Sequence, residues 1–442
     1  MTTGMLARAL AACSPTPKET ENITAVAEES KKLVEARAGP EVTGVVYGGS
    51  FAKGTWLKGD ADVDIFVKVS PSVDEERFEK LGVELGMAAL KKHGAHLRYS
   101  DHPYVEAFVN GIRVNVVSCF DVEKGKWISA ADRSPFHTEY VASAFDAQKR
   151  AHARLLKKFL KSAGIYGAEI STGGFSGYVS EVLVAKYGSL EGVLAAAAEF
   201  APGQVIAVGD YDRDVVKGFS SPLVIIDPVD PRRNLGTAIS PECAGRFTLA
   251  ARAFLRRPSV RFFSRRKARV NEKLYPHVLV AEFSHRKRSP DTIWGQMKRS
   301  QNAVAKQLEI AGFAVIRSTC ATDEETHGVF AFLLESQTLA PYTARKGPEI
   351  FRAKDVDSFV SKARSPLAMW ADKEMRVSTI VRRKETDAGR LVKTLLKKDG
   401  SGIARGMVTG NLKIYSGSRR TNALVKQAVD ELASTEGLIF GS

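Results

Sequence analysis

A strand–turn–strand segment, residues 43–66, constrains the fold more than any other part of this chain. Its apolar, β-branched start predicts one strand, and a second strand that follows a short helical turn carries Asp62 and Asp64. Because residues two apart on a strand point to the same side, the two carboxylates leave one face of a sheet together. Hard divalent cations such as Mg²⁺ prefer oxygen ligands of this kind, and substrate phosphates commonly fill their remaining positions.

The turn between these strands suits a phosphate group. Gly49 and Ser50 place backbone N–H groups and a hydroxyl at the start of a helical turn, where an anion is favoured. Taken singly, an Asp-x-Asp pair is usually a solvated strand edge, and a Gly-Ser turn is commonplace. In this order on one strand–turn–strand frame, the two favour phosphoryl or nucleotidyl transfer.

The charge of the chain indicates a polyanionic partner, since its 442 residues carry a formal net charge of +15 with a pI near 9.5. A basic surface without such a partner is the alternative. The N-terminus lacks the pattern of a signal peptide, and no apolar run is long enough to span a membrane. The four cysteines have no Cys-x-x-Cys spacing, which excludes a zinc ribbon and favours reduced thiols. We therefore expect a cytoplasmic protein with no membrane partner.

Three domains of a multi-domain α+β fold are predicted. Residues 1–141 alternate helices and strands around the acidic pair, residues 142–257 are mainly helical, and residues 258–442 mix strands and helices. The expected helices are 18–37, 73–93, 147–163, 177–187, 190–200, 240–257, 292–311, 354–363, 387–397 and 421–435. The expected strands after the opening segment are 104–109, 112–117, 277–283, 329–334 and 375–381.

Asn110 and Gly111 are the strongest short-range hairpin signal in the chain, because they separate two alternating apolar runs. A two-residue turn at this point, counted back along both strands, places Glu106 opposite Asn115. Directly opposed residues of an antiparallel pair have Cβ atoms roughly 4.5–5.5 Å apart on one face. Glu106 and Asn115 are therefore predicted to be neighbours.

Several segments carry a specific pattern in a fixed order. They are Gly49–Gly59 with Asp62 and Asp64, His102-Pro103-Tyr104-Val105, Asp132-Arg133-Ser134-Pro135-Phe136-His137, Leu155-Leu156-Lys157 with Gly164–Glu169, Gly174-Phe175-Ser176-Gly177-Tyr178, Asp227-Pro228-Val229-Asp230 with Arg233-Asn234, and Pro258-Ser259 with Phe262-Phe263. Together they resemble the archaeal-type (class I) CCA-adding enzymes, which are tRNA nucleotidyltransferases. The resemblance covers roughly residues 1–270 well and the remainder loosely.

The resemblance implies a polymerase-β-like nucleotidyltransferase head, a helical neck for base recognition, and an α+β body and tail that bind the tRNA acceptor stem. It also implies template-independent, Mg²⁺-dependent addition of C, C and A to the 3′ end of tRNA. The nucleotides would come from CTP and ATP, and the enzyme would be a homodimer.

The resemblance further implies a role for each matched side chain. Asp62 and Asp64 would hold metals that bridge the triphosphate and the attacking 3′-hydroxyl, and Arg233 would hydrogen-bond the nucleotide base. The other implied nucleotide contacts are Gly49, Ser50, Lys53, His137, Lys157 and Tyr166. Without the resemblance, Lys157 and Lys161, four apart on one predicted helix, would be read as a solvated face.

Asn115 departs from the pattern, because the family carries a third catalytic carboxylate at this position. Its side chain offers one neutral oxygen and cannot take a proton from the primer hydroxyl. Three explanations compete: a deliberately inactivated Asp→Asn form, a natural variant with altered chemistry, or another carboxylate that has taken over. Glu106 is the candidate for that carboxylate. The alternative is that Glu106 is an ordinary surface residue beside a disabled site.

Basic residues concentrate after residue 250 and predict the tRNA-binding surface of the body and tail. The predicted contacts are Arg265, Arg266, Lys267, Arg286, Lys298 and Arg299. A solvated face is the alternative for each basic run alone. Phe262 and Phe263, which lie within the first run, are expected in the core rather than stacked on bases.

Two other functions fit part of the same pattern. One is a poly(A)-adding or oligonucleotide-synthesising relative with the same head, although the segments 133–137 and 227–233 argue against it. The other is a tRNA-binding protein that has lost catalysis, which Asn115 leaves open.

Overall fold

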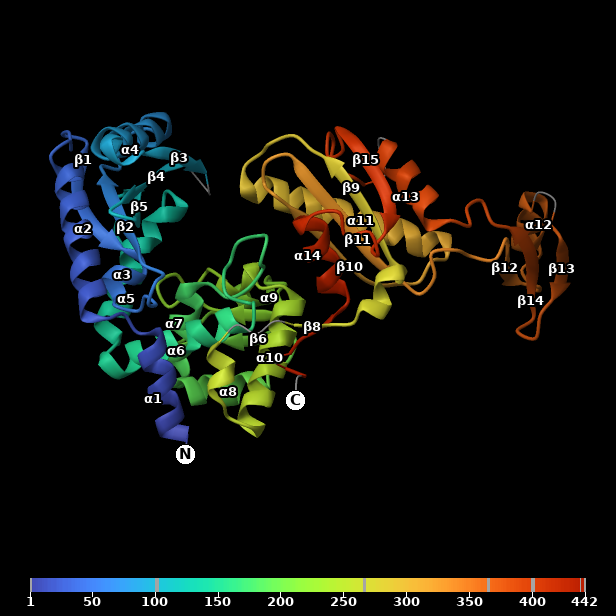
Figure 1. The fold of residues 1–442 in the computed structure, drawn as a ribbon, viewed down its shortest axis with the longest axis horizontal. Helices are drawn as coiled ribbons and strands as arrows, with labels where there is room; N and C mark the ends of the chain where they lie inside the picture. The colour runs from blue at the N-terminus through green and yellow to red at the C-terminus, as the bar shows by residue number, and fades with distance from the viewer. Residues whose placement is uncertain are drawn as a thin grey trace. The chain divides into compact units, whose positions relative to one another are not determined.

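The computed structural model describes residues 2–99, 103–264, 268–363, 366–398, 402–437 and 439–440 (Figure 1). The chain divides into two compact units, a first unit of Met1–Ala268 with Glu436–Ser442 and a second unit of Arg269–Thr435. The domain boundaries at 141/142 and 257/258 stay predictions.

A five-stranded sheet lies in the first unit, as predicted for an α+β head. Its strands, in order across the sheet, are β1 (Val42–Gly48), β2 (Asp62–Val69), β5 (Ile112–Phe120), β4 (Pro103–Val109) and β3 (His96–Tyr99). The β2–β5 pair is parallel and the other pairs are antiparallel. Alternate residues of β2, such as Val63, are buried against α2 (Pro17–Glu35) and α4 (Glu75–Ala89), which cover one face (Figure 1). Asp62 and Asp64 therefore face the other side of the sheet.

The β4–β5 hairpin confirms the predicted register. Asn110 and Gly111 have positive φ angles of 50° and 79°, the left-handed backbone that a two-residue hairpin turn requires. Glu106 pairs with Asn115 across the two strands. The turn chemistry alone therefore set this pairing correctly.

Helices make up most of the rest of the first unit. They are α1 (Thr2–Cys13), α3 (Gly49–Lys53), α5 (Arg133–Ala144), α6 (Ala147–Ser162), α7 (Gly177–Tyr187), α8 (Leu190–Ala198), α9 (Arg213–Lys217) and α10 (Pro241–Arg256), with a parallel pair of short strands, β6 (Gln204–Ile206) and β7 (Leu223–Ile225). Helices α6, α7, α8 and α10 confirm the predicted helices 147–163, 177–187, 190–200 and 240–257 to within a few residues. Helix α1 is an addition to the predicted elements.

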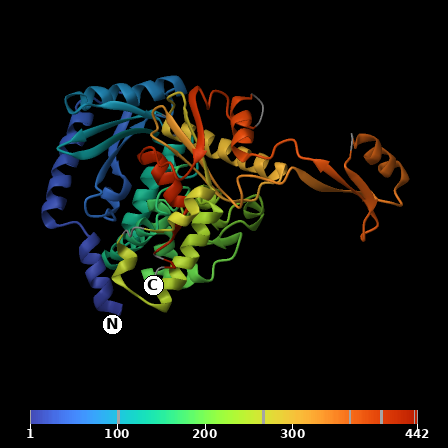
Figure 2. The same ribbon diagram turned by 45° about the vertical axis from the view of Figure 1, so that its right-hand side comes forward.

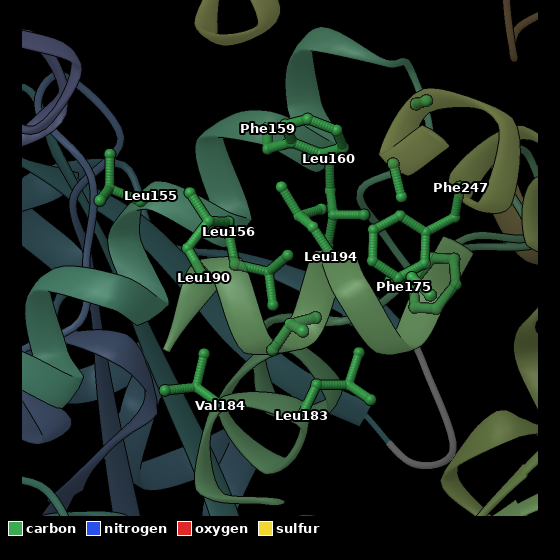
Figure 3. Close-up of a cluster of buried hydrophobic side chains, with 14 of the residues drawn as sticks. Leu155, Leu156, Phe159, Leu160, Phe175, Leu183, Val184, Leu190, Leu194 and Phe247 are labelled. Atoms are coloured by element: carbon green, nitrogen blue, oxygen red, sulfur yellow. The ribbon is translucent and has the colours of Figure 1, made fainter. Parts of the chain in front are cut away.

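Aromatic rings pack in the core of this helical region. Phe175 and Phe247 lie edge to face with ring centroids 4.8 Å apart, and Figure 3 shows them beside the leucines of α6 and α8. Phe262 and Phe263 are 0% and 5% exposed, and both contact the ring of Phe159. The prediction that these two phenylalanines belong to the core is confirmed.

A four-stranded antiparallel sheet lies in the second unit. Its strands, in order, are β10 (Val315–Thr322), β11 (His327–Leu334), β9 (Val278–Ser284) and β15 (Gly410–Ser416). Helices α11 (Pro290–Ala311) and α13 (Ala388–Lys397) cover one face, and α14 (Ala423–Leu432) covers the other. Strands β9 and β11 and these three helices were predicted, whereas β10 and β15 were not.

A smaller sheet completes the second unit. It consists of β12 (Tyr342–Glu349), β14 (Arg376–Arg382) and β13 (Ala368–Ala371), and α12 (Ala353–Lys362) packs against β12 (Figure 2). Two residues of β8 (Arg269–Val270) pair with β16 (Ser434–Thr435). Across the described residues, no helix combines the length and apolar character that crossing a membrane requires.

Candidate active site

The glycine-rich turn approaches the acidic pair closely. Gly49 begins α3 with φ +66°, and a Cβ atom built on it would lie 1.8 Å from Asp64 Oδ2. A side chain at this position would displace the carboxylate, so only glycine lets the backbone and Asp64 share this space. Ser50 follows on the same turn and is half-buried.

The parallel pairing of β2 with β5 sets Asn115 beside Asp64 and Arg113 beside Asp62. Asn115 Nδ2 donates a hydrogen bond of 2.8 Å to Asp64 Oδ1. Burial is the main cause that raises the pKa of Asp64, and the hydrogen bond from Asn115 opposes it. Asn115 Oδ1 is buried and has no hydrogen-bond partner among the described residues.

These residues fit a divalent cation. Two carboxylates on one face and an unpartnered amide oxygen beside them are the hard oxygen donors that Mg²⁺ binds. Within the described ranges, no three His, Cys, Asp or Glu side chains gather as a metal cluster. The third oxygen next to Asp64 therefore comes from an amide, which brings no charge.

Glu106 is buried in a ring of basic side chains. Its Oε1 atom lies 3.0 Å from His96 Nε2 and 3.2 Å from Arg98 Nε. Arg113 Nη1 lies 3.9 Å from its Oε2 atom, and the same guanidinium holds both oxygens of Asp62. The predicted pairing of Glu106 with Asn115 holds, while its role as a third metal carboxylate stays a prediction.

Lys53 and Lys157 share one buried carboxylate. Glu181 of α7 accepts hydrogen bonds from Lys53 Nζ at 2.9 Å, from Lys157 Nζ at 2.7 Å and from Thr55 Oγ1 at 2.5 Å. Burial by itself would raise the pKa of Glu181, but the two ammonium groups outweigh it and lower the pKa from 4.5 to about 2. Lys157 is 1% exposed, so the solvated-face alternative does not hold for it.

Tyr166 lies near Lys157 and Lys161. A Cβ atom on Gly177 would be 3.0 Å from Tyr166 Oη and 3.6 Å from Lys157 Nζ, so both groups approach the start of α7. Lys161 lies over the Tyr166 ring, 5.6 Å from its centroid. Burial raises the pKa of Tyr166, which keeps its hydroxyl a hydrogen-bond donor.

His137 and Arg233 converge on another buried carboxylate. His137 Nε2 lies 2.8 Å from Asp227 Oδ2, and Arg233 Nη1 lies 3.7 Å from the same oxygen. Tyr178 stacks on the His137 ring with centroids 3.9 Å apart and donates a 3.2 Å hydrogen bond to Asp227. Burial lowers the pKa of His137, and the hydrogen bond to Asp227 opposes this shift. Lys53 Nζ lies 4.8 Å from the centroid of the Tyr178 ring and connects this group to the one around Glu181.

Three of the six predicted tRNA contacts lie in the second unit. Arg286 follows β9 and is exposed, while Arg299 is exposed and Lys298 half-buried on α11. Arg265, Arg266 and Lys267 lie outside the described residues, as does His102 of the matched segments.

Sequence reasoning missed Glu181 and Arg113. Glu181 stands alone within the apolar run of α7, and a lone acid in such a run signals a buried partner. Arg113 lies two residues before Asn115 on one strand, which places both on the same face.

Sequence profiles of three families match the chain in order. The nucleotidyltransferase domain matches residues 27–137, and the second domain of tRNA nucleotidyltransferase matches residues 151–264. The C-terminal domain of the CCA-adding enzyme matches residues 276–411. The fold and the site of the first unit thus define a nucleotidyltransferase.

Relatives identify the family. The CCA-adding enzyme of Saccharolobus shibatae is 39% identical over 347 residues, which cover 78% of this chain and 82% of that protein. The CCA-adding enzyme of Pyrobaculum islandicum is 33% identical over 434 residues, 93% of this chain and 96% of that protein. The chain belongs to the family of CCA-adding enzymes.

A solved structure of Cid1 poly(U) polymerase with Mg and 3′-dATP bound aligns with 60% of this chain and 98% of its own, at 17% identity and a TM-score of 0.49.

Proposed function

We propose that this protein adds C, C and A to the 3′ end of tRNA from CTP and ATP, without a template and with Mg²⁺. Membership in the CCA-adding family supports the reaction. The observation that carries the site is the buried, unpartnered Oδ1 of Asn115, whose residue pairs with Asp64 on the neighbouring strand. An oxygen left without a partner there is expected where a bound cation supplies the partner.

Asp62, Asp64 and the amide oxygen of Asn115 would hold the cation. When bound, it would activate the attacking 3′-hydroxyl and stabilise the leaving pyrophosphate. The backbone of Gly49 and the hydroxyl of Ser50 orient the triphosphate beside Asp64. Asn115 cannot accept the hydroxyl proton, so attack is the step that this chain performs poorly.

Residues of both the predicted head and the predicted helical neck bind the rest of the nucleotide. Lys53 supplies a positive charge whose position Glu181 fixes. Asp227 holds the His137 ring in place, because its carboxylate accepts the Nε2 hydrogen of that ring. Arg233, whose side chain is 43% exposed, keeps donors available for the base edge of C or A. We also infer that the enzyme acts as a homodimer, as the family resemblance implies.

Nucleotide incorporation into tRNA that lacks its CCA end tests this proposal. The wild-type chain and Asn115→Asp are each given labelled CTP alone, ATP alone and both together. We expect Asn115→Asp to add two C residues and one A at least about tenfold faster than wild type, because a third carboxylate restores the proton acceptor. Untemplated runs of A would instead identify a poly(A)-adding relative. Tight tRNA binding without incorporation by either protein would identify a silent tRNA-binding protein.

A further inference from the structure

Arg113 lies between two carboxylates of the active-site sheet. Its Nε atom donates a 2.9 Å hydrogen bond to Asp62 Oδ1, and its Nη2 atom donates to Asp62 Oδ2. Its remaining nitrogen, Nη1, lies 3.9 Å from Glu106 Oε2. The guanidinium therefore engages Asp62 fully and faces Glu106 with its unused edge.

This pairing competes with a cation at Asp62. Both carboxylate oxygens already accept hydrogen bonds from Arg113, and the guanidinium charge repels a second positive charge at short range. A divalent cation that uses Asp62 gains most when Arg113 leaves. The Arg113 side chain is 45% exposed, so it has room to change rotamer.

Glu106 is placed to receive the displaced guanidinium. Its Oε1 atom is shared by His96 and Arg98, whereas Arg113 is the cation beside Oε2. Its side chain is 5% exposed and is held from the β3 side, so it stays in place while Arg113 moves. A small rotation of the Arg113 side chain would shorten the 3.9 Å separation between Nη1 and Glu106 Oε2 to that of a hydrogen bond.

We propose that Arg113 is a positioning residue that blocks Asp62 until a divalent cation binds and then transfers to Glu106. This inference rests on the proposed function, because it takes Asp62 and Asp64 as cation ligands. It gives Glu106 a role other than that of a third metal ligand. The site therefore has two states, one in which Arg113 pairs with Asp62 and one in which it pairs with Glu106. The cation favours the second state, because Asp62 is then free to bind it.

The inference is tested by measuring the Mn²⁺ affinity of the full chain in the absence of nucleotide and tRNA. The electron paramagnetic resonance signal of free Mn²⁺ reports this affinity. Arg113→Gln removes the competitor, so we expect Mn²⁺ to bind about tenfold more tightly, within the usual range of coupled sites. An unchanged or weaker affinity overturns the proposal.

Glu106→Gln separates the two roles of this carboxylate. If Glu106 only receives Arg113, Glu106→Gln weakens Mn²⁺ binding in the wild-type background and leaves it unchanged in the Arg113→Gln background. If Glu106 is a metal ligand, affinity falls by the same factor in both backgrounds, which overturns the transfer. No effect in the wild-type background overturns it as well.

Two controls fix the interpretation. Arg77 holds Glu41 in the same side-on geometry, with contacts of 2.9 and 2.6 Å, so Arg77→Gln should leave Mn²⁺ affinity unchanged. Asp64→Asn should abolish binding. If it does not, Mn²⁺ binds elsewhere and the proposed function fails. If it does while Arg113→Gln has no effect, only the role of Arg113 fails.

Discussion

At the scale of single residues, the absence of a Cβ atom at Gly49 allows the glycine-rich turn to pack directly against Asp64. Gly49→Ala places a Cβ atom 1.8 Å from the carboxylate, so either Asp64 or the turn has to move. We expect calorimetry to show CTP binding weakened about tenfold, or ~1.4 kcal/mol. Gly59→Ala is the matched control, because Gly59 has φ +69° but nothing within 4 Å of its Cβ. It carries the left-handed backbone cost of about 1–2 kcal/mol in stability alone. Equal CTP affinities for the two variants would contradict this account.

Glu181 is the residue on which the buried lysines depend. Glu181→Gln keeps the shape but leaves the ammonium groups of Lys53 and Lys157 without a counter-charge in a buried setting. Removing one partner of a buried ion pair costs about 3–5 kcal/mol, and we expect urea unfolding of the first unit to show a loss in that range. Glu76→Gln, which breaks the exposed pair with Lys80, should change stability by less than about 1 kcal/mol. Similar losses for both variants would rule out a special role for Glu181.

The same carboxylate predicts an acid dependence of stability. The pKa of Glu181 is lowered from 4.5 to about 2, so its stabilising contribution is complete above pH 4.5 and is lost as the pH falls toward 2. The wild-type chain should lose more free energy of unfolding between these pH values than Glu181→Gln, since the unfolded state takes up the proton first. Parallel pH profiles of the two proteins would contradict the prediction.

How far these residues could be predicted depends on how local their signals are. Asp62 and Asp64 are two apart on one strand, so a single periodicity places both on one face. Glu181 binds a lysine 128 residues away, and only the tertiary fold brings them together. Arg113 was likewise missed, because a strand pattern shows which face a side chain takes but not which neighbour it chooses.

At the scale of elements, the β2–β5 pair decides what Asn115 can do. Asn115→Asp removes the 2.8 Å hydrogen bond that Asn115 donates to Asp64. It also places a second carboxylate directly beside that of Asp64. Without divalent cations we expect the free energy of unfolding to fall by about 1–3 kcal/mol, as for a buried group that loses its hydrogen-bond partner. Added Mg²⁺ should stabilise Asn115→Asp more than wild type. Denaturant titrations with and without Mg²⁺ measure both effects, and equal stabilisation of the two proteins by Mg²⁺ would contradict a shared cation site.

Helices and strands could be predicted where the sequence contains a specific turn motif or a clear hydrophobic periodicity. The Asn110–Gly111 turn set the β4–β5 register, and the helical period located α6, α7 and α10. Strand β15 was missed, because its exposed outer positions and the polar residues around it weaken the alternation. It is held by its pairing with β9, which is more than a hundred residues earlier in the chain.

At the scale of the whole molecule, contacts in the first unit join regions that the sequence separates into head and neck. Arg154 of α6 donates to the carbonyl oxygens of Gly54 and Trp56 at 2.6 and 3.2 Å. Lys157 of the same helix reaches Thr55. These three bonds hold the segment after the glycine-rich turn against the helical region. No periodic pattern records such bonds, which is why they could not be predicted.

The net charge of +15 predicts how tRNA binding responds to salt. Each phosphate neutralised by a basic side chain releases counterions, so log affinity falls linearly with log salt concentration. Arg286→Ala and Arg299→Ala each remove one exposed cation, and each should reduce the slope by about 1 without changing which tRNA is preferred. Arg77→Gln lowers the net charge equally, but Arg77 is engaged by Glu41 and Glu84, so its slope should match wild type. Filter binding at a series of salt concentrations, from low to physiological, measures the affinity of each of the four proteins for tRNA that lacks CCA. A flat wild-type response, or an equal change in slope for Arg77→Gln, would show that these arginines do not contact tRNA phosphates.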